Sequence, residues 1–283
     1  MEKNHVKAVD IHAEIRNEGL PFNTKYFDAI NINRSAIDRR VSTLSGRRSV
    51  KKEFQAAWLL KAISMIDLTT LAGDDTRGNV MRLCEKAKNP VRADLLQALG
   101  MENANLTTAA VCVYHTLIPF AKEALKGTSI PIAAVSTGFP AGNISLEDKI
   151  TEIKKSVAAG AKEIDIVISR DLVLESKWKE LYDEIKLCRE ACGDAHMKTI
   201  LATGEIPTYT KVAKASWVAM MAGSDFIKTS TGKESVNATL PVSLVMIRAI
   251  RAYYELTGVK VGYKPAGGIQ KALPLLGDES FLL

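Results

Sequence analysis

Cysteine is scarce in this chain, with four residues among 283 and no Cys-x-x-Cys pair. So few and such scattered thiols exclude a disulfide framework, and reduced structural cysteines are the simpler interpretation. No run approaches the roughly 18 uninterrupted apolar residues that a membrane helix needs, and the N-terminal Met-Glu-Lys-Asn-His lacks the apolar stretch of a signal peptide. We therefore expect no membrane partner and a cytoplasmic location, with nuclear presence left open.

Two signatures of cofactor-dependent proteins are also missing. No Gly-x-Gly-x-x-Gly turn follows the first predicted strand, which disfavours a dinucleotide-binding sheet. His115 and His196 flank predicted strands, but neither has a cysteine, histidine or carboxylate at a metal-ligand spacing. We expect no cofactor and no metal ion.

The net charge of +6 raises the question of an anionic partner. Basic residues gather in Asn33–Val41 and Gly46–Lys52, but no aromatic residues are interleaved with them and no nucleic-acid motif accompanies them. We therefore expect no nucleic-acid partner. A solvated basic face and the binding of phosphorylated small molecules remain the two interpretations.

From about Lys61 onward, short apolar runs alternate with amphipathic stretches, which predicts a parallel sheet with crossover helices. Seven such units favour the α/β class and a TIM (β/α)8-type barrel. The predicted strands are Ala62–Asp67, Thr108–Tyr114, Pro131–Ser136, Glu163–Ile168, Met197–Leu201, Phe226–Thr229 and Lys260–Lys264. The predicted helices include Thr76–Ala87, Leu146–Ala159, Trp178–Cys192, Tyr209–Ala222 and Pro241–Thr257.

The first 50 residues differ from the rest by their polar content, and Ser35–Leu44 is typical of a helix. We interpret residues 1–50 as a helical N-terminal extension packed on the barrel. The barrel is expected over residues 51–271, with a divergent tail over residues 272–283.

Two lysines are the most informative residues of the chain. Lys228 and Lys264 each end a predicted strand just before glycines, and their separation of 36 residues fits one strand-helix-strand step. Active sites of parallel barrels lie at the carboxyl ends of the strands, so both ammonium groups should converge in one cleft. Like charges in a partly dry site disfavour protonation, which predicts one free amine that attacks a carbonyl carbon to form a Schiff base.

Further charged residues, Asp67, Asp165 and Lys198, lie in or at the ends of predicted strands. Burying any one of them alone would be costly, so a set of mixed sign in one barrel predicts a site. Two alternatives stay open, because Asp67 could simply cap a helix and Asp165 could serve only in a structural ion pair.

Polar, glycine-bearing turns follow two consecutive predicted strands, over Thr229–Lys233 and Pro265–Gly268. Such turns can direct backbone N–H groups at an anion, and the first also carries an ammonium group. Beside the two lysines, they predict a phosphorylated carbonyl substrate.

Taken in order, the motifs of this chain resemble the eukaryotic type of deoxyribose-phosphate aldolase from roughly Lys25 to Lys271. The motifs that carry this resemblance are Met65-Ile-Asp-Leu-Thr-Thr-Leu71, Ala109-Ala-Val-Cys-Val-Tyr114, Gly138-Phe-Pro-Ala-Gly142, Lys162-Glu-Ile-Asp-Ile-Val167, Thr203-Gly-Glu205, Asp225 to Lys233, Val236-Asn-Ala-Thr239 and Gly262-Tyr-Lys-Pro-Ala-Gly-Gly268.

The resemblance implies reversible, metal-free cleavage of 2-deoxy-D-ribose 5-phosphate into D-glyceraldehyde 3-phosphate and acetaldehyde. It implies that Lys228 is the nucleophile, that Lys264 lowers the pKa of Lys228, and that Asp165 shuttles protons with water. A homo-oligomer is left open. The resemblance also gives supporting residues of the inner site, Asp67, Lys198, Cys112 and Thr69, and residues of the phosphate site, Gly232, Lys233, Gly267 and Gly268.

The chain departs from this family at its end. The resemblance implies a further helix, an eighth strand with a Gly-Ala-Ser-Ser/Thr loop and a last helix after Lys271, where Ala272–Leu283 stands instead. We therefore expect that strand and helix to be missing, with unpaired edges on the first and seventh strands and exposed apolar faces. Two alternatives to the aldolase follow, a catalytically impaired isoform with an interaction or regulatory role, and a Schiff-base lyase for another sugar phosphate.

Overall fold

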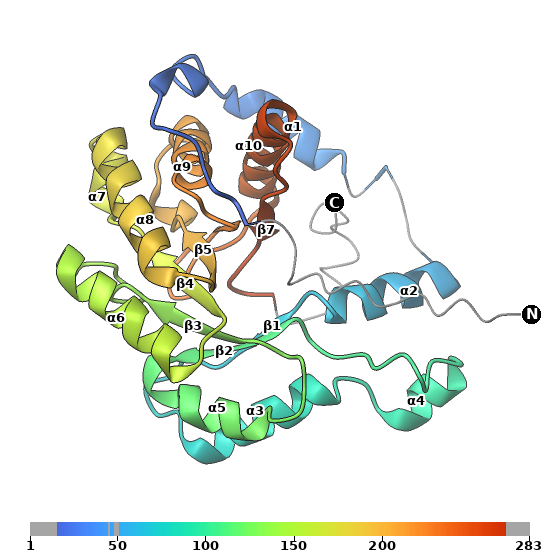
Figure 1. The fold of residues 1–283 in the computed structure, drawn as a ribbon. Coiled ribbons are helices and arrows are strands. Elements are labelled where there is room, and N and C mark those ends of the chain that lie inside the picture. The colour runs from blue at the N-terminus through green and yellow to red at the C-terminus, as the bar shows by residue number, and fades with distance from the viewer. Residues whose placement is uncertain (1–15, 45, 48–50, 270–283) are drawn as a thin grey trace, which may run out of the picture.

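One sheet of seven parallel strands is the central feature of the computed structural model, which describes residues 16–44, 46–47 and 51–269. The strands follow one another in the sheet in chain order, β1 to β7, and Figure 1 shows helices covering the outside of the curled sheet. This arrangement confirms the predicted barrel type, while the tail over residues 272–283 lies outside the described residues. The strands are β1 (Asp67–Thr69), β2 (Ala110–Tyr114), β3 (Ile132–Ser136), β4 (Glu163–Val167), β5 (His196–Ile200), β6 (Phe226–Lys228) and β7 (Gly262–Lys264).

The helices that the sequence predicts are present, and further helices lie between them. Both ends are confirmed for Leu146–Ala159 and Trp178–Cys192, whereas the sequence prediction missed α2, α4, α5 and α7. The α-helices are α1 (Arg34–Ser42), α2 (Lys52–Ile63), α3 (Arg77–Lys88), α4 (Ala93–Ala98), α5 (Ile118–Ala124), α6 (Leu146–Ala159), α7 (Arg170–Leu174), α8 (Trp178–Cys192), α9 (Tyr209–Met221) and α10 (Leu240–Thr257). The 3-10 helices are η1 (Thr24–Tyr26), η2 (His115–Leu117) and η3 (Thr203–Glu205).

The predicted start of the first strand, Ala62–Asp67, is wrong. Helix α2 continues through Ile63 and ends at its C-cap Ser64, and β1 begins only at Asp67. The segment Trp58-Leu-Leu-Lys-Ala62 consists largely of strong helix formers, so the apolar residues after it complete a helical turn instead of starting a strand.

Capping residues explain where the long helices begin and end. The Ser145 hydroxyl accepts a hydrogen bond from the Asp148 N–H at the start of α6, and Thr239 does the same for the Val242 N–H at the start of α10. Gly160 ends α6 in the left-handed region with φ 117°, a conformation that favours glycine. These local signals explain why both helices can be predicted from the sequence.

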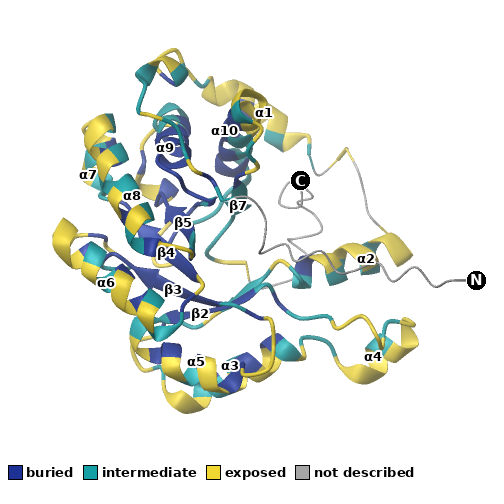
Figure 2. Cartoon of the chain, in the orientation of Figure 1, coloured by how far each residue is buried: buried dark blue, intermediate teal, exposed yellow. Residues whose placement is uncertain are grey.

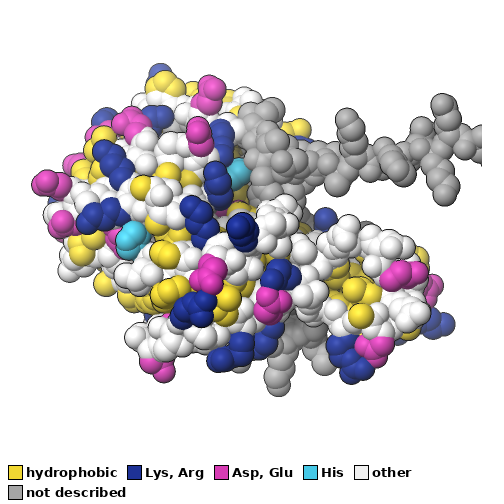
Figure 3. All heavy atoms as spheres, turned by 60° about the horizontal axis from the view of Figure 1, so that its bottom comes forward, with side chains coloured by type: hydrophobic (Ala, Val, Ile, Leu, Met, Phe, Trp, Pro, Cys, Tyr) yellow, Lys and Arg dark blue, Asp and Glu magenta, His cyan; other side chains and the backbone are white. Residues whose placement is uncertain are grey.

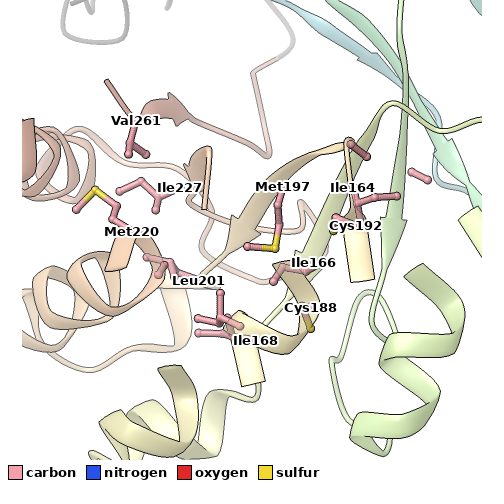
Figure 4. Close-up of a cluster of buried hydrophobic side chains, with 14 of the residues drawn as sticks. Ile164, Ile166, Ile168, Cys188, Cys192, Met197, Leu201, Met220, Ile227 and Val261 are labelled. Carbon is pink, nitrogen blue, oxygen red and sulfur yellow. The ribbon is translucent and has the colours of Figure 1, made fainter. Parts of the chain in front are cut away.

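Side-chain alternation divides the interior into two apolar clusters. Ile164, Ile166 and Ile168 lie in the larger cluster with Cys188 and Cys192 of α8, between the sheet and its helices (Figure 4). Successive side chains of a strand point to opposite faces, so the residues between them on β4 face the inside of the curled sheet. A second, smaller cluster lies on that inner face and consists of Leu71, Ala110, Cys112, Ala133 and Val135.

The strand order ends at β1 and β7, which are therefore the edges of the described sheet. Helices α2 and α4 expose large apolar side chains, and Figure 2 shows both helices as mostly exposed or intermediate. Phe54 on α2 is 67% exposed, and Leu95 on α4 is 49% exposed. The expectation that the faces left by the missing final elements are exposed stays a prediction, because residues 270–283 lie outside the described part of the chain.

The described part of the N-terminal extension is anchored on α9 and α10. The Asn17 amide donates hydrogen bonds to the carbonyl oxygens of Met220 and Ser224, at 2.7 and 2.8 Å, and its oxygen accepts one from the Tyr253 hydroxyl at 3.0 Å. These groups lie at the amino-terminal end of β6, away from the strand ends that carry the lysines. The domain boundaries at residues 50 and 271 stay predictions.

Charges on the surface are mixed in sign. On the face shown in Figure 3, Lys and Arg side chains are interspersed with Asp and Glu. Among the described helices, none is long and apolar enough to span a membrane.

Candidate active site

Charged side chains occupy the inner face of four neighbouring strands and of β1. Asp165 lies between Ile164 and Ile166, which pack outward, so its carboxylate points inward. Lys198 is its register partner on β5 and follows the outward-facing Met197. Lys228 follows Ile227 in the same way on β6. The alternation that buries the core therefore places these charged groups together.

Five of the predicted residues form one continuous chain of contacts. The Lys228 ammonium lies 2.6 Å from one oxygen of Asp165, whose other oxygen lies 3.1 Å from Lys198. Lys198 lies 3.0 Å from Asp67, and Asp67 lies 2.7 Å from Lys264. The contacts thus run from β6 through β4, β5 and β1 to β7. The structure brings together the residues that the sequence singled out at five separate positions.

The ion pairs compensate an unusually deep burial of charge. Asp165 is 0% exposed and Lys198 is 2% exposed, and such groups are stable in the ionised form only when paired. Burial alone would raise the pKa of Asp165, but the charges of Lys198 and Lys228 outweigh it and hold that pKa below its ordinary value. The pKa of Asp67 is likewise lowered, because Lys198 and Lys264 outweigh burial. Both carboxylates are therefore ionised at neutral pH.

Lys228 and Lys264 lie side by side, as the spacing predicts, but they do not share a carboxylate. They are register partners on β6 and β7, with α10 as the connection between the strands. Lys264 pairs with Asp67 and also donates a hydrogen bond to the Met65 carbonyl oxygen at 3.1 Å. The interpretation of Asp67 as a helix cap is wrong, since Asp67 begins β1 and contacts two lysines.

The expected lowering of the Lys228 pKa is not found in this arrangement. Burial, the largest influence, lowers the pKa of Lys228, and the charge of Lys198 acts in the same direction. The charge of Asp165, with a smaller contribution from Cys112 and the hydrogen bond to Asp165, outweighs both and raises that pKa above its ordinary value. The expectation considered only the second lysine. It overlooked the buried Asp165 carboxylate, which lies 2.6 Å from Lys228 and stabilises its protonated form.

Glu163 belongs to the cluster although the sequence prediction missed it. It lies two residues before Asp165 on β4, on the same inner face, and its carboxylate makes a short hydrogen bond to Lys198. With three carboxylates around it, Lys198 has a pKa well above its ordinary value even though burial lowers it. The signal was present, because residues at i and i+2 of a strand share a face.

The apolar half of the inner face adjoins this cluster. Cys112 on β2 is fully buried there, and burial, with the charge of Asp165, raises the pKa of its thiol to about 12. Tyr114 and Phe139 pack on the same group of side chains, with ring centroids 5.9 Å apart. Thr69 does not join the cluster, since it is exposed and its hydroxyl donates to the Asp67 carbonyl oxygen at 2.8 Å.

The two predicted phosphate turns lie against each other. A Cβ atom on Gly232 would lie 3.6 Å from the Cα of Gly267, so the turns after β6 and β7 are in contact. Gly232, Gly267 and Gly268 have φ values of 86°, 89° and 80°, which favour glycine. Lys233 is exposed beside them, and its N–H donates to the Thr231 hydroxyl at 3.1 Å.

Among the described residues, no group of three or more His, Cys, Asp or Glu side chains is arranged to hold a metal ion. The carboxylates of the cluster face ammonium groups instead.

The fold and the cluster together define a class, a parallel α/β barrel type with a buried lysine-carboxylate cluster at the carboxyl ends of its strands. Residues 61–281 match the family of DeoC/LacD family aldolases. The chain belongs to this family.

Known relatives agree with this assignment. The chain is similar to the deoxyribose-phosphate aldolase of Mus musculus, with 59% identity over 256 residues that cover 90% of this chain and 80% of the relative. It is 57% identical to that of Homo sapiens over 258 residues, covering 90% and 81%.

Solved structures show the same fold at low sequence identity. The tetrameric deoxyribose phosphate aldolase of Aeropyrum pernix has a TM-score of 0.63 and 20% identity, with 86% of this chain and 90% of that one covered. The aldolase QR15 has a TM-score of 0.60 and 23% identity, with coverage of 78% and 86%.

Proposed function

We propose that this protein is a class I aldolase that cleaves 2-deoxy-D-ribose 5-phosphate into D-glyceraldehyde 3-phosphate and acetaldehyde. The observation that carries the proposal is the buried ion pair of Lys228 and Asp165, which places a nucleophile beside a proton acceptor at a strand end. The names and high identities of the mammalian relatives support the choice of substrate.

In the proposed reaction, Lys228, which the Asp165 carboxylate holds as an ammonium in the resting site, first loses its proton to water, and its free nitrogen adds to the aldehyde carbon C1. Loss of water gives an imine. Removal of the C3 hydroxyl proton then breaks the C2–C3 bond, and its electron pair forms an enamine as D-glyceraldehyde 3-phosphate leaves. Protonation at C2 and hydrolysis release acetaldehyde and restore the amine. Asp165, at 2.6 Å from Lys228, is the proposed shuttle for these protons.

The remaining site residues have supporting roles in the proposal. Lys198 and Asp67 hold Asp165 and Lys264 in position through their ion pairs. Lys264 contributes a positive charge next to Lys228 in register. Cys112 lines the pocket, and the phosphate is bound by the turns that contain Gly232, Lys233, Gly267 and Gly268.

Location and assembly belong to the same proposal. We place the protein in the cytoplasm, and a homo-oligomer is consistent with the tetramer formed by the Aeropyrum pernix protein. The relatives give no support to an interaction or regulatory role instead of catalysis.

Reductive trapping tests the proposal. With 2-deoxyribose 5-phosphate present, borohydride should fix an adduct on the peptide that contains Lys228. Lys228→Met should abolish the adduct, whereas Lys179→Met, which removes an exposed lysine, should leave it intact. A folded protein that forms no adduct on Lys228 would rule out the proposed mechanism. Faster turnover of a different sugar phosphate would favour the alternative lyase.

A further inference from the structure

Arg170 connects three loops at the carboxyl end of the sheet. It begins α7, shortly after β4, and its guanidinium donates to the Pro140 carbonyl oxygen at 2.8 Å, in the loop after β3. The same group lies 2.9 Å from Glu205 in η3, after β5, and 3.4 Å from Glu234, in the loop after β6. A planar guanidinium can bind several groups at once in fixed directions, which an ammonium cannot do as rigidly.

Glu234 transmits this connection to the first phosphate turn. Its side chain is only 2% exposed, and both of its carboxylate oxygens accept the Thr231 N–H, at 3.0 and 3.2 Å. This contact closes the turn that contains Gly232 and Lys233. The Glu234 carbonyl oxygen also accepts a hydrogen bond from the Asn237 amide at 3.0 Å.

Asn237 extends the contact to the second turn. A Cβ atom on Gly267 would lie 2.4 Å from Cγ of Asn237, so this side chain packs directly beneath the glycine. The Ala238 N–H donates to the Ala266 carbonyl oxygen at 3.2 Å, which ties the same two loops through the backbone. The conformations of both turns therefore depend on the loop that Arg170 holds.

The backbone next to Arg170 is also held in place by α8. The Ser169 N–H and hydroxyl both donate to Glu184 of α8, at 2.9 and 2.5 Å. Glu184 pairs with Lys149 of α6 at 2.9 Å, and the Lys149 side chain is 1% exposed. Buried pairs of this kind hold their surroundings in one geometry because neither charge can be left alone.

We propose that Arg170 is a positioning residue that prepares both glycine turns for the phosphate of the substrate, an inference that rests on the proposed function. Arg170 fixes the turns through Glu234, and it also neutralises that carboxylate. An uncompensated negative charge one turn away from the phosphate site would repel the phosphate. Loss of Arg170 should therefore penalise phosphorylated ligands selectively.

The test compares Arg170→Met with Arg251→Met, which removes an exposed arginine from a surface ion pair on α10. KM and kcat are measured with 2-deoxyribose 5-phosphate and with unphosphorylated 2-deoxyribose. In Arg170→Met, we expect KM for the phosphorylated sugar to rise at least about tenfold, because one partner of a buried charge pair is lost. Values for the unphosphorylated sugar should stay near wild type, as should both sets of values in Arg251→Met. Equal losses on both sugars, or no change on either, would overturn the inference.

A milder variant covers the case in which Arg170→Met does not fold. Glu205→Gln removes a partly exposed partner of Arg170 and should give a smaller rise in the same KM. Calorimetric titration with inorganic phosphate separates this inference from the proposed reaction. If the wild type binds phosphate but cleaves no sugar, the proposed function fails, and weaker phosphate binding by the variants still supports the role of Arg170. Equal binding by all variants, or none by the wild type, would refute that role.

Discussion

Asp67 and Lys264 form an ion pair of 2.7 Å between β1 and β7, the two end strands of the described sheet. The pair brings the edges of the curled sheet together through side chains. It also assigns Lys264 to a different carboxylate from the one that holds Lys228. The two lysines are neighbours, yet each has its own counter-ion, and this division governs how the site titrates.

Removing Lys264 should weaken the connection between the end strands. In Lys264→Met, Lys198 is the one counter-ion left to Asp67 among the described residues. We expect the free energy of unfolding to fall by about 1–3 kcal/mol because a mostly buried ion pair is broken. Urea unfolding measures the loss. Lys179→Met, which removes an exposed helical pair, should change stability by less than about 0.5 kcal/mol. Equal stability of the two variants would show that the pair between β1 and β7 contributes nothing.

The titration of Lys228 should respond to Asp165 more than to Lys264. In Asp165→Asn, the carboxylate charge that raises the pKa of Lys228 is gone, while burial and Lys198 still lower that pKa. The pH at which Lys228 becomes reactive toward formaldehyde and cyanoborohydride should therefore move down, as followed by peptide mass spectrometry.

Two comparisons make this titration decisive. Asp94→Asn, which alters an exposed pair with Arg92, should leave the reactivity profile of Lys228 unchanged. Lys264→Met should move the profile less than Asp165→Asn does. A larger shift in Lys264→Met would restore the view that the second lysine sets the pKa of the first.

Much of this site could be predicted from the sequence because strand geometry is local. The inward direction of Asp165, Lys198 and Lys228 follows from their apolar neighbours, and the register of Lys228 with Lys264 follows from one strand-helix-strand step. The partners of each lysine could not be predicted in this way. They depend on how the sheet curls, which brings Asp67 of β1 near Lys264 of β7.

The partners of Arg170 could be predicted from the sequence even less than those of the lysines. Its partners come from loops after three different strands, and the sequence spacing between them carries no signal of their proximity. The start of β1 was mispredicted for a local reason, since strong helix formers extend α2 into the apolar run before it.

Stability should depend on pH at both ends of the scale. The pKa values of Asp67 and Asp165 are lowered on folding, so their contribution is present above the unfolded value of about 3.9 and is lost as pH falls through the folded pKa. Those of Lys198 and Lys228 are raised, so their contribution is present below about 10.4 and is lost as pH rises through the folded pKa. Urea unfolding across pH should therefore show a plateau between these limits.

Lys198→Met should change the dependence of the free energy of unfolding on pH in a specific way. Near pH 7 the variant leaves buried carboxylates without their shared counter-ion, which should cost about 3–5 kcal/mol. The remaining carboxylates then have higher pKa values than in the wild type, so they take up protons more readily as pH falls. We expect the stability difference from wild type to narrow below about pH 5. A difference that stays constant with pH would mean that Lys198 contributes through packing alone.

Two adjacent glycines allow the contact between the phosphate turns to be isolated. Gly267 and Gly268 have similar positive φ values of 89° and 80°, so alanine at either position meets a similar backbone penalty of about 1 kcal/mol. Gly267 faces Asn237, at 2.4 Å from an added Cβ, whereas no atom of the described residues lies within 4 Å of one on Gly268. The free energy of unfolding should therefore fall further in Gly267→Ala than in Gly268→Ala.

Adding Asn237→Ala should recover part of the loss of stability in Gly267→Ala and none in Gly268→Ala, because it relieves only the contact between position 267 and Asn237. Equal losses in the two glycine variants would show that the backbone, and not Asn237, requires glycine at position 267.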